Sequence, residues 1–301
     1  MITRQLLFVA FALRAASVVS GEVRCPVNAE TLRYHSLDGS QIAIPVTINN
    51  SGPYEFLVDT GLQVTIVEPS LAEELGLKPA GNADVSAVGN HSKAEFATPD
   101  LIEVGPLAVR RPTVVVESLA KIQALHPKIR GLLGGNFLWH FDLLIDYAHK
   151  LLCFDESGEM RQNLRGEHIT VVQQADRPLN SQLPHRLLVP VQIAGEELKV
   201  MSLDSGSAVP FLYANDLKTP AWLQKTRAGS VAGDKSQMSL AALPSEEVRI
   251  GTRVLPQVTF LVPAGNASKI NGSGEDGLLP TSLFKRVFVS YAEHFVIFDP
   301  R

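Results

Sequence analysis

Two carboxylates in this chain share one short pattern, each at the end of an apolar run. The first pattern is DTG at residues 59–61, after FLV, and the second is DSG at residues 204–206, after MSL. Carboxyl groups held a few ångströms apart resist double ionisation, so one keeps its proton while the other acts as a base. Such a pair can activate water and protonate a carbonyl oxygen. Asp59 and Asp204 are therefore candidate catalytic acids.

The sequence around the two acids recurs at a nearly constant offset. Each acid follows a Pro-Val pair, Pro45 or Pro190 being fourteen positions upstream. A Gly-Leu-Leu run begins at Gly131 in the first half and at Gly277 in the second, and the halves close with DYAHKLLCFD and SYAEHFVIFD. A period of about 145 residues is too long for a solenoid unit and suits two copies of one domain.

Alternating polar and apolar residues predict strands in both halves, so we expect an all-β protein with short helices. The predicted strands include residues 41–48, 111–116, 187–193 and 257–262. Residues 69–77, with Pro69 near the start, predict a short helix. Residues 85–97 and 230–242 are candidate hairpins.

These features together resemble the aspartic peptidases of the bacterial retropepsin-like group, in a bilobed arrangement like that of pepsin. The resemblance covers nearly all of the mature chain. It implies two homologous acid-protease-type β-barrel lobes with the active site between them, where Asp59 and Asp204 share a water molecule. It also implies hydrolysis of peptide bonds in a peptide or protein substrate bound as an extended strand, without a metal or other cofactor.

The residues next to the acids take supporting roles in this resemblance. Thr60 and Ser205 would exchange hydroxyl hydrogen bonds across the lobes, and Gly61 and Gly206 would let backbone amides approach the carboxylates. Ser207 would donate its hydroxyl to the carboxylate of the second acid. Since Leu62 cannot do the same in the first half, we expect Asp204 to be the base and Asp59 the proton carrier.

The two glycine-centred hairpins would form flaps over the cleft. Their tips carry the candidate substrate contacts Gly89, Asn90 and His91 in the first lobe and Gly233 and Asp234 in the second.

Two departures from the family pattern leave alternatives open. Leu62 stands where serine or alanine is usual, and Pro280 replaces the glycine that ends the hydrophobic-hydrophobic-Gly element. These residues favour a rival interpretation, a peptide-binding module of the same fold without turnover. In a third interpretation each half pairs with another chain, whereas the gapless spacing between the halves favours an acid pair within one monomeric chain.

The first 21 residues carry Arg4 before a short apolar run and small residues, which predicts a secretory signal with a mature N-terminus at Gly21 or Glu22. We therefore expect a secreted or periplasmic protein with lobes at residues 22–160 and 161–301 and no membrane span after signal removal. A net charge of −4 without long runs of like charge disfavours nucleic acid as a partner.

Two cysteines, Cys25 and Cys153, exclude a disulfide-rich scaffold and a cysteine-based zinc cluster. They could form one bridge. A buried free thiol is the favoured interpretation of Cys153, because it lies in the apolar run KLLCF.

Overall fold

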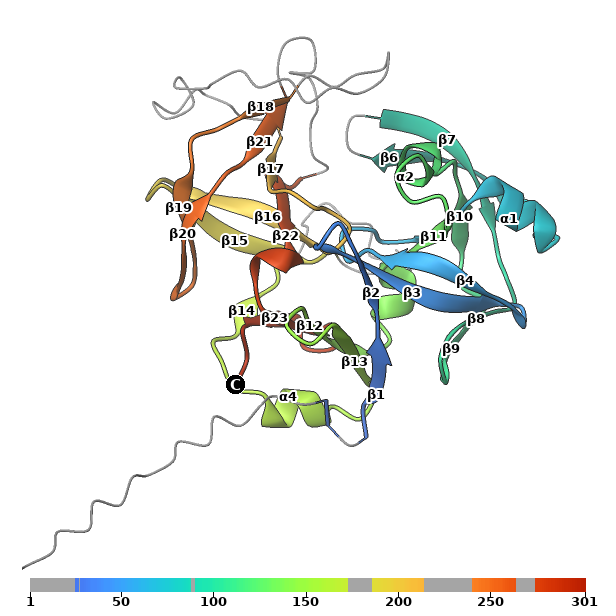
Figure 1. Ribbon diagram of the computed structural model, residues 1–301, viewed down its shortest axis with the longest axis horizontal. Coiled ribbons are helices and arrows are strands. Elements are labelled where there is room, and N and C mark those ends of the chain that lie inside the picture. Colours follow the sequence, from blue (N-terminus) through green and yellow to red (C-terminus); the bar gives the residue numbers. More distant parts are fainter. Residues whose placement is uncertain (1–24, 27, 88–89, 173–185, 214–239, 264–273) are drawn as a thin grey trace, which may run out of the picture.

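The computed structural model describes residues 25–26, 28–87, 90–172, 186–213, 240–263 and 274–301, with side chains omitted for 82–87 and 90–93. Strands dominate these ranges and form three sheets. Figure 1 shows one sheet in each lobe and a third sheet beside both. The predicted class, a mostly-β protein with two lobes, is confirmed.

The sheet of the first lobe has ten strands, with β2 (His35–Leu37) paired to β3 at the side of the main path. The other nine follow the order β6 (Gly81–Ala87), β7 (Asn90–Ala97), β10 (Val114–Val116), β5 (Thr65–Val67), β11 (Ile129–Leu133), β4 (Ser51–Val58), β3 (Gln41–Ile48), β8 (Leu101–Val104) and β9 (Leu107–Arg110). The predicted strand 41–48 is thus confirmed as β3, and the predicted hairpin 85–97 lies within β6 and β7.

The sheet of the second lobe has eight strands in a matching order. They are β18 (Leu240–Ala242), β21 (Leu261–Pro263), β17 (Phe211–Leu212), β22 (Gly277–Pro280), β16 (Leu198–Asp204), β15 (Leu188–Ile193), β19 (Glu246–Ile250) and β20 (Arg253–Val258). In each lobe the strand that leads to the acid, β4 or β16, pairs in parallel with the Gly-Leu-Leu strand, β11 or β22. Both acids therefore leave their sheets beside a Gly-Leu-Leu strand.

A six-stranded sheet combines strands from both halves, which the sequence analysis did not predict. Its order is β1 (Glu30–Arg33), β13 (Leu151–Asp155), β12 (Asp142–Asp146), β23 (Arg286–Ser290), β24 (Phe295–Phe298) and β14 (Ile169–Thr170). At its centre Leu144 faces Phe288, and these two residues also occupy corresponding positions of the two halves. This pairing is what a local two-fold axis between the halves requires.

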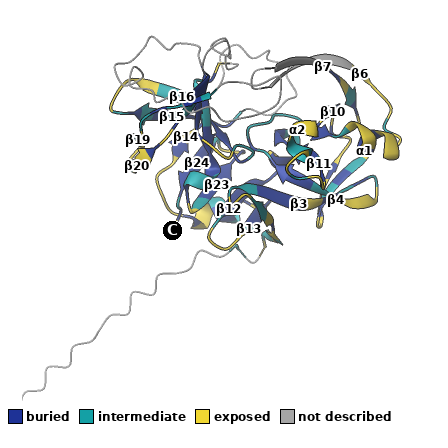
Figure 2. Cartoon of the chain, turned by 45° about the horizontal axis from the view of Figure 1, so that its top comes forward, coloured by how far each residue is buried: buried dark blue, intermediate teal, exposed yellow. Residues whose placement is uncertain are grey.

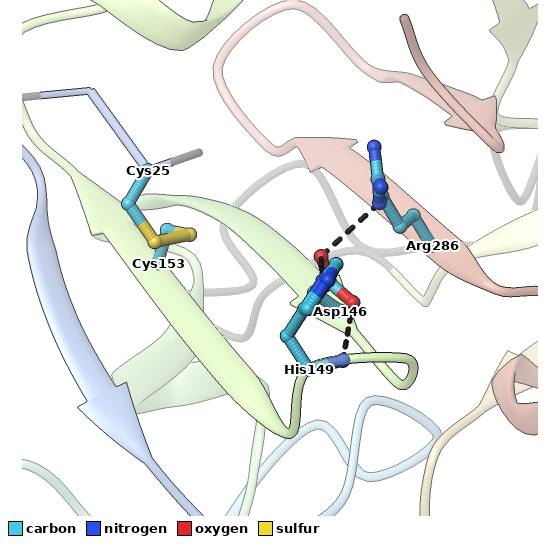
Figure 3. Close-up of a disulfide and its surroundings, with 5 residues drawn as sticks. All are labelled: Cys25, Asp146, His149, Cys153 and Arg286. Atoms are coloured by element: carbon cyan, nitrogen blue, oxygen red, sulfur yellow. Dashed lines mark hydrogen bonds and ion pairs between the residues drawn. A yellow bond between two sulfur atoms is a disulfide. The ribbon is translucent and has the colours of Figure 1, made fainter. Parts of the chain in front are cut away.

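A buried ion pair crosses the centre of this shared sheet. Asp146 on β12 lies 3.1 Å from Arg286 Nε on β23 and 2.8 Å from the Nδ1 atom of His149 (Figure 3). A buried carboxylate that lost either partner would keep much of its desolvation cost, so these contacts favour one arrangement of the two halves.

Alternate residues of the lobe strands pack on opposite faces of the sheet. Ile42 and Ile44 of β3 join the largest apolar cluster, whereas Ala43 joins a smaller cluster on the other face with Leu57 and Leu132. Most strand residues are accordingly buried, while exposed residues gather on α1 and the β19–β20 hairpin (Figure 2). Burial on two faces fixes the register, because a slip by one residue would exchange the two sets of side chains.

Helices in the described residues are short. The predicted helix is confirmed as α1 (Pro69–Glu74), with proline in its first turn and Glu68 accepting a hydrogen bond from the Leu71 amide. The others are α2 (Ala120–Gln123), α3 (Gly135–Leu138), α4 (Glu159–Asn163) and the 3₁₀ turn η3 (Thr281–Leu283). None of the described helices is long and apolar enough to cross a membrane.

The predicted strand at residues 257–262 is wrong as a single element. β20 ends at Val258 and pairs with β19, whereas β21 begins at Leu261 and pairs with β17 and β18. The chain changes neighbours between the two strands, and Thr259 and Phe260 make that change. Hydrophobic alternation continues through such a crossing because both strands face the same core.

The favoured interpretation of Cys153 as a free thiol is also wrong. Cys25 and Cys153 form a disulfide with Cα atoms 5.6 Å apart (Figure 3). Cys153 is buried as expected, but β1 pairs with β13 and brings the preceding segment, with Cys25, beside it. The two cysteines are 128 positions apart in the sequence, so no local pattern indicated that they would meet.

We expect replacement of both cysteines by alanine to lower the free energy of unfolding by about 3 to 5 kcal/mol, because the bridge closes a loop of 128 residues in the unfolded chain. Urea titration of the parent and of Cys25→Ala/Cys153→Ala measures this difference. The parent in reductant is the control and should approach the variant. Equal midpoints for oxidised parent and variant would contradict the expectation.

Candidate active site

Asp59 and Asp204 lie at the ends of β4 and β16, where each strand leaves its parallel neighbour. The amide of Asp59 donates to the carbonyl of Leu133 at 3.0 Å, and Asp204 is the register partner of Pro280. Each acid is thereby held by its own Gly-Leu-Leu strand, and both carboxyls are buried.

Each carboxyl receives two backbone N–H groups from its own turn. Asp59 Oδ1 accepts from Gly61 at 2.9 Å and from Leu62 at 3.2 Å. Asp204 Oδ1 accepts from the two corresponding positions, 206 and 207, at 2.7 Å and 3.0 Å. The two turns are therefore alike in their backbone bonds, and these N–H groups favour the charged form of each acid.

Burial and mutual repulsion oppose these amides. The pKa of Asp59 is raised well above its usual range, first by burial and then by the negative charge of Asp204. Burial also raises the pKa of Asp204, and the two carboxyls are hydrogen-bonded to each other. The pair therefore holds one proton over a pH range in which separate carboxyls would both be charged.

The glycine after each acid makes room for the acid of the other lobe. A Cβ atom added to Gly61 would lie 2.8 Å from the Cγ atom of Asp204, and one added to Gly206 would lie 2.5 Å from the Cγ atom of Asp59. Neither glycine has a positive φ angle. These glycines were predicted to let backbone amides approach the carboxylates. The structure shows a further reason for glycine, which is the close contact between the lobes at both positions.

Thr60 and Ser205 join the lobes through four hydrogen bonds. The amide of each donates to the hydroxyl of the other, at 3.1 Å from Thr60 and 3.0 Å from Ser205. The Thr60 hydroxyl donates to Leu203 O at 2.8 Å, and the Ser205 hydroxyl donates to Val58 O at 2.7 Å. All four bonds are buried, so loss of either hydroxyl would leave backbone groups unpaired beside the acids.

The hydroxyl of Ser207 does not contact the carboxylate of Asp204 as expected. It donates to the carbonyl of Val209 at 2.8 Å, and only the backbone amide of Ser207 reaches the acid. The predicted cause of an asymmetric pair is therefore wrong. Proton retention by Asp59 instead has support from burial and from the neighbouring Asp204 charge.

We expect Ser207→Ala to leave the acidic limb of a pH–rate profile in place, because the lost hydroxyl serves Val209 and not the acid pair. The profile of kcat/KM against pH measures this. Leu62→Ser is the complementary variant at the corresponding position of the first lobe. An upward shift of the acidic limb by about one pH unit in Ser207→Ala would contradict this expectation, because it would show that the Ser207 hydroxyl does contact Asp204.

Pro280 is accommodated without disturbing the second acid. In the first lobe the amide of Gly134 donates to the Thr65 hydroxyl, and the amide of Thr65 donates to Asn136 Oδ1. The second lobe has proline at both corresponding positions, 280 and 210. Proline lacks an N–H, so neither donor exists there and neither is left unpaired.

The predicted flap residues are only partly described. Asn90 begins β7 and His91 follows it, opposite Ala87 and Ser86 of β6. Gly89, Gly233 and Asp234 lie outside the described residues. Elsewhere in the described ranges, no group of three or more His, Cys, Asp or Glu residues could hold a metal ion.

Comparison with known proteins finds a family similarity in the first lobe. Residues 44–137, which include Asp59 and the Gly-Leu-Leu strand, match the family model described as aspartyl protease. The first lobe is thus similar to the aspartyl proteases. The resemblance drawn from the sequence motifs is therefore confirmed at the level of the family.

The chain also matches a solved structure. A retropepsin-like aspartic protease from Rickettsia conorii matches 44% of this chain and 96% of its own, with 20% sequence identity and a TM-score of 0.32. No curated protein sequence matches the chain.

Three residues near the acids were not predicted to have roles. Gln41, the first residue of β3, donates from Nε2 to the carbonyl of Gly206 at 2.6 Å and so adds a further bond between lobes. The negative charge of Asp204 acts on the partly buried Tyr147, and that of Asp59 acts on the buried Tyr291. The recurring DYA and SYA tripeptides were the sequence signal for the tyrosines.

Proposed function

We propose that this protein is an aspartic endopeptidase in which Asp59 and Asp204 form one catalytic pair within a single chain. The observation that carries the proposal is the pair itself, two buried carboxyls from opposite lobes that hydrogen-bond to each other. Chemistry that needs one charged and one protonated carboxyl has its groups in reach of one water molecule.

In the proposed reaction the charged member of the pair removes a proton from water as the water attacks the peptide carbonyl. The protonated member donates its proton to the carbonyl oxygen, giving a neutral tetrahedral intermediate without a covalent bond to the enzyme. Asp204 is the proposed base and Asp59 the proposed proton carrier, since the pKa of Asp59 is raised by burial and also by the Asp204 charge. No electron transfer or cofactor enters this step.

The two departures from the family pattern do not favour the non-catalytic alternative on geometric grounds. Leu62 still supplies its amide to Asp59, and Pro280 still stands beside Asp204 in the sheet register. A peptide-binding module without turnover is therefore the secondary candidate. The contacts between Thr60 and Ser205 within one chain likewise favour an intrachain pair over pairing with another chain.

The proposal also includes the substrate conformation, the boundary between the lobes and the cellular location that the sequence predicts. Substrate would bind as an extended strand between the lobes, under the flaps that the sequence predicts around Asn90 and Gly233. The lobes would divide near residues 160 and 161. A secreted or periplasmic location is supported by the Cys25–Cys153 disulfide, because such bridges persist in oxidising compartments.

Cleavage of a mixed peptide library tests the proposed function, with and without a statine-type mimic of the tetrahedral intermediate. We expect turnover at acidic pH that the mimic suppresses, because such mimics match the geometry of a carboxyl pair. A preparation with the mass of one chain and full activity supports the intrachain pair. Tight peptide binding without any cleavage would favour the binding module instead.

A further inference from the structure

Two tyrosines follow the central strands of the shared sheet at corresponding positions. Tyr147 comes directly after β12, and Tyr291 comes directly after β23. β12 and β23 pair around the local two-fold axis. Each tyrosine is influenced by the acid of the opposite half, Asp204 for Tyr147 and Asp59 for Tyr291. Each phenol group is therefore acted on by the charge of one acid, and in both cases that acid belongs to the opposite half.

The hydroxyls of these tyrosines differ in their partners. The Tyr147 hydroxyl lies 2.5 Å from the hydroxyl of Thr281, the first residue of η3. Alignment of the Gly-Leu-Leu runs puts Gly135 at the position that corresponds to Thr281, and glycine has no hydroxyl to offer. Among the described residues, the buried hydroxyl of Tyr291 has no hydrogen-bond partner. The sequence difference between Gly135 and Thr281 explains this asymmetry.

An unpartnered buried hydroxyl is costly and uncommon in folded proteins. The Tyr291 side chain is 9% exposed, and its pKa is raised by burial and then by the charge of Asp59. The Tyr147–Thr281 contact and the local two-fold symmetry place Tyr291 beside Gly135, and Asp59 is held at Leu133, two residues before Gly135. Asp59 would gain from an additional donor when it becomes charged. In the proposed reaction it becomes charged after it protonates the carbonyl oxygen.

We propose that Tyr291 is a positioning residue for the acid pair, its hydroxyl donating a hydrogen bond to the Asp59 carboxylate that forms when Asp59 gives up its proton. The inference rests on the proposed peptidase function and deepens it. The Tyr147 hydroxyl is instead paired with the Thr281 hydroxyl. The structure is thereby asymmetric in the support of its two acids.

Several other titratable groups surround this position. Asp204 faces Asp59 from the second lobe, and Tyr147 and Tyr213 are in turn influenced by Asp204. Glu293, two residues after Tyr291, is 59% exposed at its side chain and pairs with Arg161. Among these charged groups, Asp59 is the one whose charge raises the pKa of the Tyr291 hydroxyl.

Tyr291→Phe tests the role, because it keeps the ring and removes only the hydroxyl. A lost donor makes the Asp59 carboxylate less stable, so the pair should keep its last proton to higher pH. We expect the alkaline limb of the pH–rate profile to move up by about one pH unit and kcat to fall about tenfold with KM unchanged. Since the hydroxyl has no protein partner, the variant should unfold at the same or a higher urea concentration.

Tyr147→Phe is the matched control. It removes the hydroxyl that bonds to Thr281, so it should lower stability while the alkaline limb stays in place. Equal pH profiles and equal kcat for the parent and Tyr291→Phe would overturn the proposal and leave Tyr291 with a packing role only.

A second measurement does not depend on turnover. Carbon-13 NMR of aspartate-labelled parent and Tyr291→Phe follows the final ionisation of the acid pair directly, and we expect the same upward shift. A parent that cleaves no peptide would refute the proposed peptidase, whereas identical titrations in the two proteins would refute the role of Tyr291.

Discussion

Asp59→Asn and Asp204→Asn are each expected to lower peptide turnover by about a thousandfold or more while peptide affinity is retained. Asparagine keeps the size and the backbone contacts of each acid but can neither take a proton from water nor deliver one to the carbonyl oxygen. Cleavage of a peptide library measures the loss of turnover, and binding of an uncleaved peptide measures affinity. Substantial turnover in either variant would refute the shared pair.

The same variants should not be less stable at neutral pH. Burial raises the folded-state pKa of both acids, so the folded protein binds more protons than the unfolded chain. Stability contributed by such a group falls as pH rises from the usual carboxyl range through its raised pKa. Asparagine removes this dependence, and urea titrations at acidic and neutral pH should show a smaller decrease with pH than in the parent. A marked loss of stability at neutral pH would mean that the turnover loss reports misfolding.

Gly206→Ala is expected to reduce kcat/KM by about a hundredfold, because its new methyl group would lie 2.5 Å from Asp59 Cγ. Residue 206 cannot easily retreat, since its carbonyl accepts from Gln41 at 2.6 Å and the preceding Ser205 is held to the first lobe. The Asp59 carboxyl would therefore have to move away from Asp204. Peptide kinetics measure the loss.

Two variants serve as controls for this prediction. Ser207→Ala changes the adjacent position without adding atoms, and it should retain nearly full activity. Gly61→Ala places the methyl group 2.8 Å from Asp204 Cγ and should show a loss of the same kind. A Gly206→Ala enzyme with kcat/KM within twofold of the parent would show that the pair tolerates displacement, contrary to the close contact between the lobes.

Features that depend on local pattern could be predicted from the amino-acid sequence alone. The alternating residues 41–48 predicted β3, and Pro69 predicted the start of α1, because side-chain period and proline geometry act within one element. The two D-[TS]-G tripeptides identified both candidate acids, since each follows an apolar strand and precedes a matching Gly-Leu-Leu run. The family resemblance rested on the same residues.

Features that depend on contacts between distant segments could be seen only in the folded chain. The β12–β23 pairing, the Cys25–Cys153 bridge and the Gln41 contact join residues more than 120 positions apart, and no local period encodes such partners. The Ser207 hydroxyl was assigned wrongly for a related reason. A hydroxyl donates to whichever acceptor the fold places nearest, and here that acceptor is the carbonyl of Val209. The unpartnered Tyr291 hydroxyl likewise depends on how the two halves pack around their axis. Gly135 stands where the other half has Thr281, and glycine has no hydroxyl to pair with the tyrosine.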